Sequence, residues 1–110
     1  MNLKELALEL EMEPDEIREL LEIFIESSES DLDKLKKAID EGDQKQAADA
    51  AHSIKGASAN LGFMDISSVA KSIEHKARNN GLSDLSDEVL IIKDKLSLIS
   101  KSIDDISLIG

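Results

Sequence analysis

The sequence predicts an all-α protein, an up-and-down antiparallel four-helix bundle with an N-terminal helical appendage, in one domain over residues 1–110. Apolar residues recur at helical spacing, and turn signals are few, because the chain has one proline and five glycines. The core must be aliphatic, since two phenylalanines are the only aromatic residues. Short connections make successive helices antiparallel neighbours, which favours a bundle.

The appendage covers about residues 1–12, with a helix over about 2–10, and the bundle covers about 14–106. Pro14 and the acidic residues after it suit the first turn of a helix over about 14–41. Ser27–Ser30 leave open a bend or a break in that helix. Its predicted inward face is Ile17, Leu21, Phe24, Leu32, Leu35 and Ile39.

The second and third bundle helices are expected over about 43–61 and 66–79. Asp43 and Gln46 form a plausible capping box for the first of these, and Asp65 is the expected cap of the other.

Gly81 is expected to end the third bundle helix, and the fourth is expected to begin near Ser83. Its first turn would hold Asp84, Asp87 and Glu88. Alternating steps of four and three residues predict one buried stripe along it, typical of a bundle helix. The stripe is Leu85, Val89, Ile92, Leu96, Ile99, Ile103 and Ile106.

Charge and composition exclude several classes of function. The formal net charge of −11 repels phosphate backbones and anionic lipid headgroups, so neither nucleic acid nor a membrane is an expected partner. The chain has no cysteine, which excludes disulfides and a thiolate nucleophile. No apolar run approaches the length of a membrane span, and the first residues lack the layout of a secretory signal. We expect a cytoplasmic monomer.

The stretch AHSIKGASANLG, residues 51–62, places a glycine inside a predicted helix, where it costs about 1 kcal/mol relative to alanine. At about 100° per residue, one side of this helix forms a buried stripe of Ala47, Ala51, Ile54, Ser58 and Leu61. His52 falls about 140° from the centre of that stripe and should face solvent. The residues expected beside it are Ala48, Lys55, Gly56 and Ala59.

This exposed strip suits the acceptance of a phosphoryl group by His52. Gly56, Ala48 and Ala59 would let a partner approach the helix backbone closely. Lys55, one turn after the histidine, can place an ammonium beside a bound anion. An exposed imidazole is largely neutral at pH 7 and therefore nucleophilic. The alternative is an ordinary surface histidine.

The next helix offers one possible neighbour for the imidazole. Its predicted buried stripe is Ile66, Val69, Ala70, Ile73 and Ala77. Glu74 lies at the border of this stripe, where it either reaches across to the preceding helix or remains a solvated glutamate. His75 points away from the stripe, so the two histidines face different directions and no metal site is expected. Phe63 and Met64 either form a docking patch or close the end of the bundle.

His52, Lys55, Gly56 and Gly62 form the pattern H-x-x-K-G-x-x-x-x-x-G, which resembles the signature of histidine phosphotransfer (HPt) domains. The stretch AAHSIKGASANLGF is also similar to the phosphoacceptor module of chemotaxis histidine kinases. The resemblance implies a four-helix bundle that carries one phosphorylatable histidine.

The resemblance also implies a role for each matching residue. His52 would exchange a phosphoryl group with an aspartate of a response-regulator receiver domain, or receive it from the ATP of a histidine kinase. Lys55 would steady the phosphoryl oxygens, and Gly56 would leave room for them. Glu74 matches the glutamate that orients the imidazole in the chemotaxis group, whereas Lys71 replaces the second histidine of that group. Magnesium would belong to the partner, and no cofactor is expected on this chain.

Other functions remain open at this stage. The chain has no glycine-rich nucleotide loop and no second acid–base pair, so we expect a phosphoryl carrier without an autonomous catalytic site. The alternatives are the phosphoacceptor module of a chemotaxis-type kinase and a helical interaction bundle that is not phosphorylated. A hydrolase that uses His52 as a base is disfavoured, because the site is expected to be convex.

Overall fold

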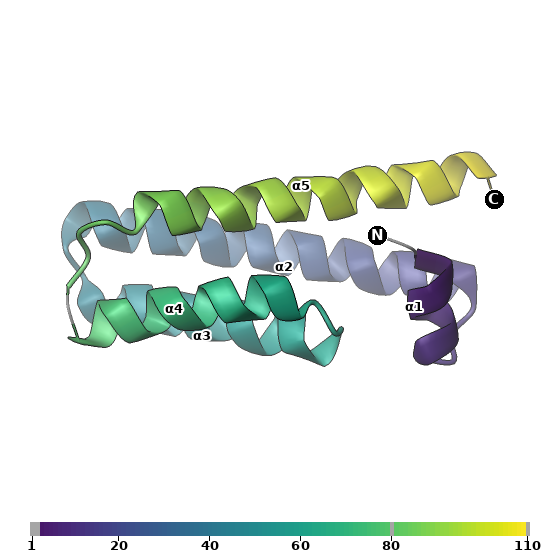
Figure 1. The fold of residues 1–110 in the computed structure, drawn as a ribbon. Helices are drawn as coiled ribbons and strands as arrows, with labels where there is room; N and C mark the ends of the chain where they lie inside the picture. Colours follow the sequence, from purple (N-terminus) through teal and green to yellow (C-terminus); the bar gives the residue numbers. More distant parts are fainter. Residues whose placement is uncertain (1–2, 80, 110) are drawn as a thin grey trace.

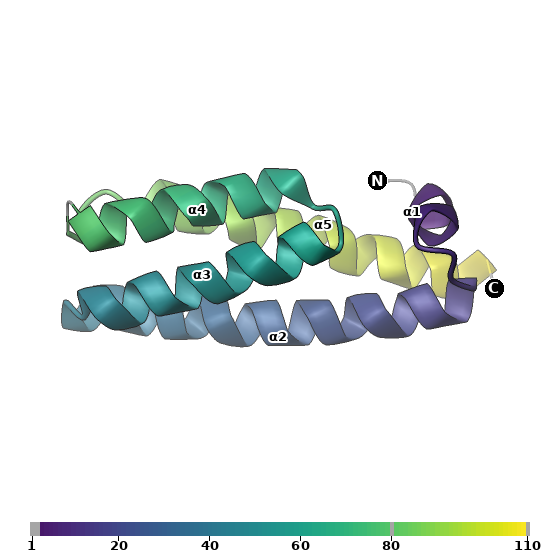
Figure 2. The same cartoon turned by 90° about the horizontal axis from the view of Figure 1, so that it is seen from below.

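A computed structural model of the chain describes residues 3–79 and 81–109, and it confirms the predicted bundle and its helical appendage. The helices are α1 (Leu3–Glu9), α2 (Pro14–Glu41), α3 (Gln44–Asn60), α4 (Met64–Asn79) and α5 (Ser86–Ile109). Helix α2 packs against α3 and α5, and α4 packs against the same two helices, which closes the bundle (Figures 1 and 2). No strand occurs in the described residues. None of their helices has the length and apolar character needed to cross a bilayer.

Helix α2 runs without interruption from Pro14 to Glu41, so Ser27–Ser30 produce no break. Pro14 occupies the start of the helix, where its missing N–H costs nothing, and Glu13 and Glu16 form a capping box around it. Because α2 and α5 are longer than α3 and α4, they continue past the shorter pair (Figure 1). Helix α1 packs against α2 in this extension.

The core is aliphatic, as the composition predicts. The stripe expected on α5 is buried from Leu85 to Ile103, and the side chain of Ile106 lies outside the described part of the chain. Phe24 of α2 and Phe63 of the α3–α4 turn contact each other with ring centroids 5.3 Å apart. Phe63 therefore closes the end of the core, whereas Met64 is 61% exposed.

Gly62 ends α3 and sets the direction of α4. Its φ of +83° lies in the left-handed region, which glycine adopts without a steric penalty. The N–H of Gly62 donates to the carbonyl of Ala59, and the N–H of Phe63 donates to that of Ser58. These two bonds form a Schellman motif, which satisfies carbonyls that the helix end would otherwise leave unpaired.

Two predicted helix starts are wrong by a few residues. Helix α4 begins at Met64, directly after the Gly62 turn, because the carbonyl of Phe63 already accepts from the N–H of Ser67. Asp65 therefore lies in the first turn rather than at the cap. Helix α5 begins at Ser86.

Asp84 lies before α5 and not in its first turn. Its φ of +66° is left-handed and incompatible with the helix, and aspartate tolerates that conformation in turns. The turn places Leu85, which is 1% exposed, in the core immediately before the helix begins.

Asp43 is the N-cap of α3, as predicted, and its side chain accepts a hydrogen bond from the N–H of Gln46. Asp43→Ala should lower the free energy of unfolding by about 1 kcal/mol, because this N–H then loses its partner. Urea unfolding followed by circular dichroism measures the change. Asp43→Asn, which can still accept the bond, should remain close to wild type, and an equal loss in both variants would contradict the capping role.

Candidate functional site

The site lies where α3 and α4 run side by side (Figure 2). The predicted stripe of α3 is buried against the core, from Ala47 to Leu61. His52 lies on the outward side of α3, and 62% of its side chain is exposed. The imidazole is therefore accessible, although its helix is firmly packed on the opposite face.

Glu74 of α4 reaches across to α3 and contacts the imidazole. Its Oε2 lies 3.0 Å from Nδ1 of His52, and its Oε1 lies 2.7 Å from Nζ of Lys55. Arg78, one turn further along α4, places Nη2 3.1 Å from Oε2. Three nitrogen-bearing side chains from two helices thus share the carboxylate of Glu74, a residue that is 9% exposed.

The surrounding charges keep the Glu74 carboxylate ionised. Burial raises the pKa of Glu74, but hydrogen bonds from Lys55 and Arg78 and the positive charge of Lys55 lower it by more. The pKa of this carboxyl group consequently lies below its ordinary value. An ionised carboxylate can only accept hydrogen bonds, so Nδ1 of His52 must carry the proton in this contact.

A buried serine links the two helices beside the site. The hydroxyl of Ser67 on α4 donates to the carbonyl of Lys55 on α3 at 3.1 Å. Ser67 precedes Glu74 by two turns and lies on the same face of α4. One α4 face therefore contacts both the backbone and the side chain of Lys55, which positions Glu74 beneath the imidazole.

The strip of small residues around His52 differs from the prediction at one position. Gly56 and Ala59 are exposed, and a Cβ atom added at Gly56 would meet no atom within 4 Å. Ala48 is only 1% exposed, so its predicted place on the accessible strip is wrong. Helix α3 packs against both α2 and α4, and its buried arc is therefore wider than a single stripe.

Arg78 and Ser67 are site residues that the sequence analysis did not identify. A glutamate and an arginine four residues apart on a helix, as in Glu74 and Arg78, are a recognisable pair. That spacing indicates contact between the two side chains, but it does not reveal that a third residue from another helix shares the carboxylate. Ser67 gives no comparable signal.

The second histidine belongs to a different environment. His75 is exposed on α4, where Nδ2 of Asn79 lies 3.3 Å from its Nδ1. In the part of the chain that the structure describes, no three histidine or acidic side chains are grouped as a metal site would require.

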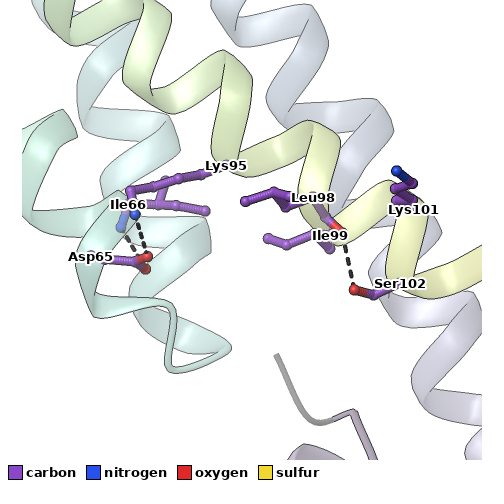
Figure 3. A pocket seen from close by; sticks show the side chains of 7 residues that line it. All are labelled: Asp65, Ile66, Lys95, Leu98, Ile99, Lys101 and Ser102. Carbon is purple, nitrogen blue, oxygen red and sulfur yellow. Dashed lines mark hydrogen bonds and ion pairs between the residues drawn. The ribbon is translucent and has the colours of Figure 1, made fainter.

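A groove of about 400 Å³ lies elsewhere, between the start of α4 and α5 (Figure 3). Asp65 and Lys95 form an ion pair of 2.9 Å at its edge. Burial raises the pKa of Asp65, but hydrogen bonds from Lys95 and from the N–H of Ile66 bring it below its ordinary value. His52 does not line this groove, so the exposed imidazole and the groove are separate features.

These observations define a class of protein, a helical bundle that presents a histidine, paired with a glutamate, on the outside of a helix hairpin. The sequence model of the Hpt domain family matches residues 19–102, and the chain belongs to this family. Histidine phosphotransfer in phosphorelays is accordingly its function, as the sequence predicts.

Solved structures agree with this assignment. The chain is similar to the crystal structure of histidine-containing phosphotransfer protein B from Pseudomonas aeruginosa PAO1, with 27% identity and a TM-score of 0.81 over 96% of this chain and 91% of that one. It shares its fold with the Hpt domain of a sensor hybrid histidine kinase from Shewanella, with 20% identity, a TM-score of 0.74 and coverage of 96% and 92%. No curated protein sequence matches the chain.

Glu74→Gln should make the stability of the protein less sensitive to acid. The folded-state pKa of Glu74 is lowered, so the carboxylate contributes stability above its unfolded pKa and loses that contribution as the pH falls through the folded value. The free energy of unfolding in urea should fall more in wild type than in Glu74→Gln between pH 7 and about 3.5.

Glu22→Gln is the matched control, because it removes an exposed carboxylate of α2. This control should retain the acid sensitivity of wild type. If Glu74→Gln and wild type lose stability in parallel, the charged contacts of Glu74 do not stabilise the fold.

Proposed function

We propose that His52 is the phosphoacceptor, and that it exchanges a phosphoryl group with an aspartate of a response-regulator receiver domain. The observation that supports this most directly is the hydrogen bond between Nδ1 of His52 and the Glu74 carboxylate. Because Nδ1 holds the proton, the lone pair of Nε2 is free and belongs to an exposed ring. The imidazole is thus oriented with its nucleophilic atom available to a partner.

In the forward step, the lone pair of Nε2 attacks the phosphorus of the aspartyl phosphate on the receiver. The N–P bond forms, the bond between phosphorus and the aspartate oxygen breaks, and its electron pair returns to the aspartate carboxylate. The proton stays on Nδ1, so the phosphorylated ring is positively charged and is stabilised by Glu74. The reverse step transfers the group to a receiver aspartate by the same path.

The chain acts in this scheme as a monomeric carrier with no cofactor of its own, and any magnesium belongs to the receiver or the kinase. Lys55 is the cation that steadies the phosphoryl oxygens during transfer. Gly56 and Ala59 leave the surface beside His52 low enough for a receiver domain to approach.

The Glu74 contact also suits a second candidate, the phosphoacceptor module of a chemotaxis-type histidine kinase, since a glutamate orients the acceptor imidazole in that group. In that case a kinase would phosphorylate His52 with the γ-phosphoryl group of ATP. Labelling by ATP and a kinase, rather than by a loaded receiver, distinguishes the two candidates.

His52→Gln should abolish labelling of the protein by a receiver domain loaded from acetyl phosphate, because glutamine has no nucleophilic imidazole nitrogen. Wild type should acquire an acid-labile label under the same conditions. His75→Gln is the matched control and should be labelled at the wild-type rate. Label that persists in His52→Gln, or disappears in His75→Gln, would contradict the assignment of the acceptor.

Substitutions at Gly56 separate partner access from folding. Gly56→Ala should raise the free energy of unfolding by a few tenths to about 1 kcal/mol, because alanine favours the helix and its Cβ atom meets no neighbour. Gly56→Gln should retain the helical circular dichroism but slow transfer from the receiver by at least about tenfold, a barrier increase of about 1.4 kcal/mol. Transfer at the wild-type rate in Gly56→Gln would refute the access role.

A further inference from the structure

Lys55 binds Glu74 in the structure, and in the proposed function it also binds the phosphoryl oxygens. Its Nζ lies 2.7 Å from Oε1 of Glu74, the carboxylate whose other oxygen lies 3.0 Å from Nδ1 of His52. The phosphoryl group, in the proposed function, is bound to Nε2, which points away from Nδ1 across the ring. A Lys55 ammonium that turns toward phosphoryl oxygens on Nε2 thereby releases the carboxylate on the Nδ1 side.

The departure of Lys55 would weaken the support of Glu74. Only 12% of the Glu74 side chain is exposed, and a buried carboxylate without a partner is costly. Such a carboxylate would take up a proton or rotate toward water, and in either case His52 would lose the acceptor that holds the proton on Nδ1.

Arg78 is placed to prevent this loss. Its Nη2 lies 3.1 Å from Oε2, the same oxygen that faces Nδ1 of His52. It lies one turn from Glu74 on the same helix, so its contact does not depend on the movement of any α3 side chain. A guanidinium has five N–H donors in a planar fork and can take over the oxygen that Lys55 releases.

We propose that Arg78 is a positioning residue, which holds the Glu74 carboxylate on Nδ1 of His52 while Lys55 moves to the phosphoryl group. Arg78 thus remains the counter-charge to Glu74 in the part of each transfer when Lys55 is on the phosphoryl group. This inference rests on the proposed role of His52 and Lys55, and it assigns to Arg78 a task that acts through Glu74 and His52.

The test measures the tautomer of His52 by the ¹⁵N chemical shifts of its ring nitrogens. All variants are made in a His75→Gln background, so that one imidazole is observed, and spectra are recorded at about pH 8, where an ordinary imidazole is neutral. Lys55→Ala reproduces the state in which the lysine has left Glu74. In this variant His52 should retain the Nδ1–H tautomer, because Arg78 still holds the carboxylate.

Adding Arg78→Ala to Lys55→Ala should shift both nitrogens toward the averaged values of an unrestrained imidazole. The matched control adds Lys71→Ala instead, which removes the same charge from an exposed position of α4 and should leave the shifts unchanged. Loss of the Nδ1–H tautomer in Lys55→Ala alone would overturn the proposal, and so would its retention in the double variant with Arg78→Ala.

A second measurement separates this inference from the proposed function. Arg78→Ala should slow transfer from a loaded receiver several-fold more than Lys71→Ala does, while His52 is still labelled. Equal rates in these two variants would overturn the positioning role, even if labelling of His52 is normal. If wild type is not labelled at all, the proposed function fails, whereas the tautomer comparison still tests the contact between Arg78 and Glu74.

Discussion

The geometry of the site depends on the contacts that the carboxylate of Glu74 makes. This carboxylate lies at the boundary between α3 and α4, and it binds side chains from both helices. Glu74 is 9% exposed, and a charge on a residue so nearly buried is tolerable only when it is paired. Here Lys55 and Arg78 lie on its two carboxylate oxygens. Because the same group contacts the imidazole and joins the two helices, the position of the His52 ring is coupled to the packing of the hairpin.

Small side chains make this contact possible. Most of the buried residues of α3 and half of those of α4 are alanine or serine, and these two helices pack closely against each other. Helices that meet through small residues approach closely. A glutamate at the edge of such an interface can span the remaining distance, whereas larger residues would hold the helices apart.

The helices and the core were predictable because periodicity determines which face of a helix is buried. The same reasoning failed where the burial of a residue, or the start of a helix, depends on more than one neighbouring element. Ala48 is buried because α3 packs against two helices, and a wheel with one stripe cannot represent that. Asp65 is a good cap residue, but the turn at Gly62 already begins α4 before it. The sequence offered the contact of Glu74 with α3 as one of two alternatives. It did not predict that Arg78 shares the carboxylate, because that sharing depends on the position of α3.

The two glycines of the phosphotransfer pattern, Gly56 and Gly62, occur for different reasons. Gly62 has a left-handed φ, so the backbone itself requires it. Gly56 is helical and its surroundings would admit a side chain, so the fold does not require it. The proposed approach of a partner domain supplies a reason for glycine at this position that the fold itself does not.

The unequal lengths of the helix pairs determine how the domain can be joined to other polypeptide. Helix α1 and the end of α5 both lie where α2 and α5 extend past the shorter hairpin, whereas His52 lies on that hairpin (Figures 1 and 2). Polypeptide attached next to α1 or to the end of α5 would lie at this end of the bundle and leave the imidazole uncovered. A bundle of this shape can therefore be fused within a larger signalling protein without covering the face that carries His52.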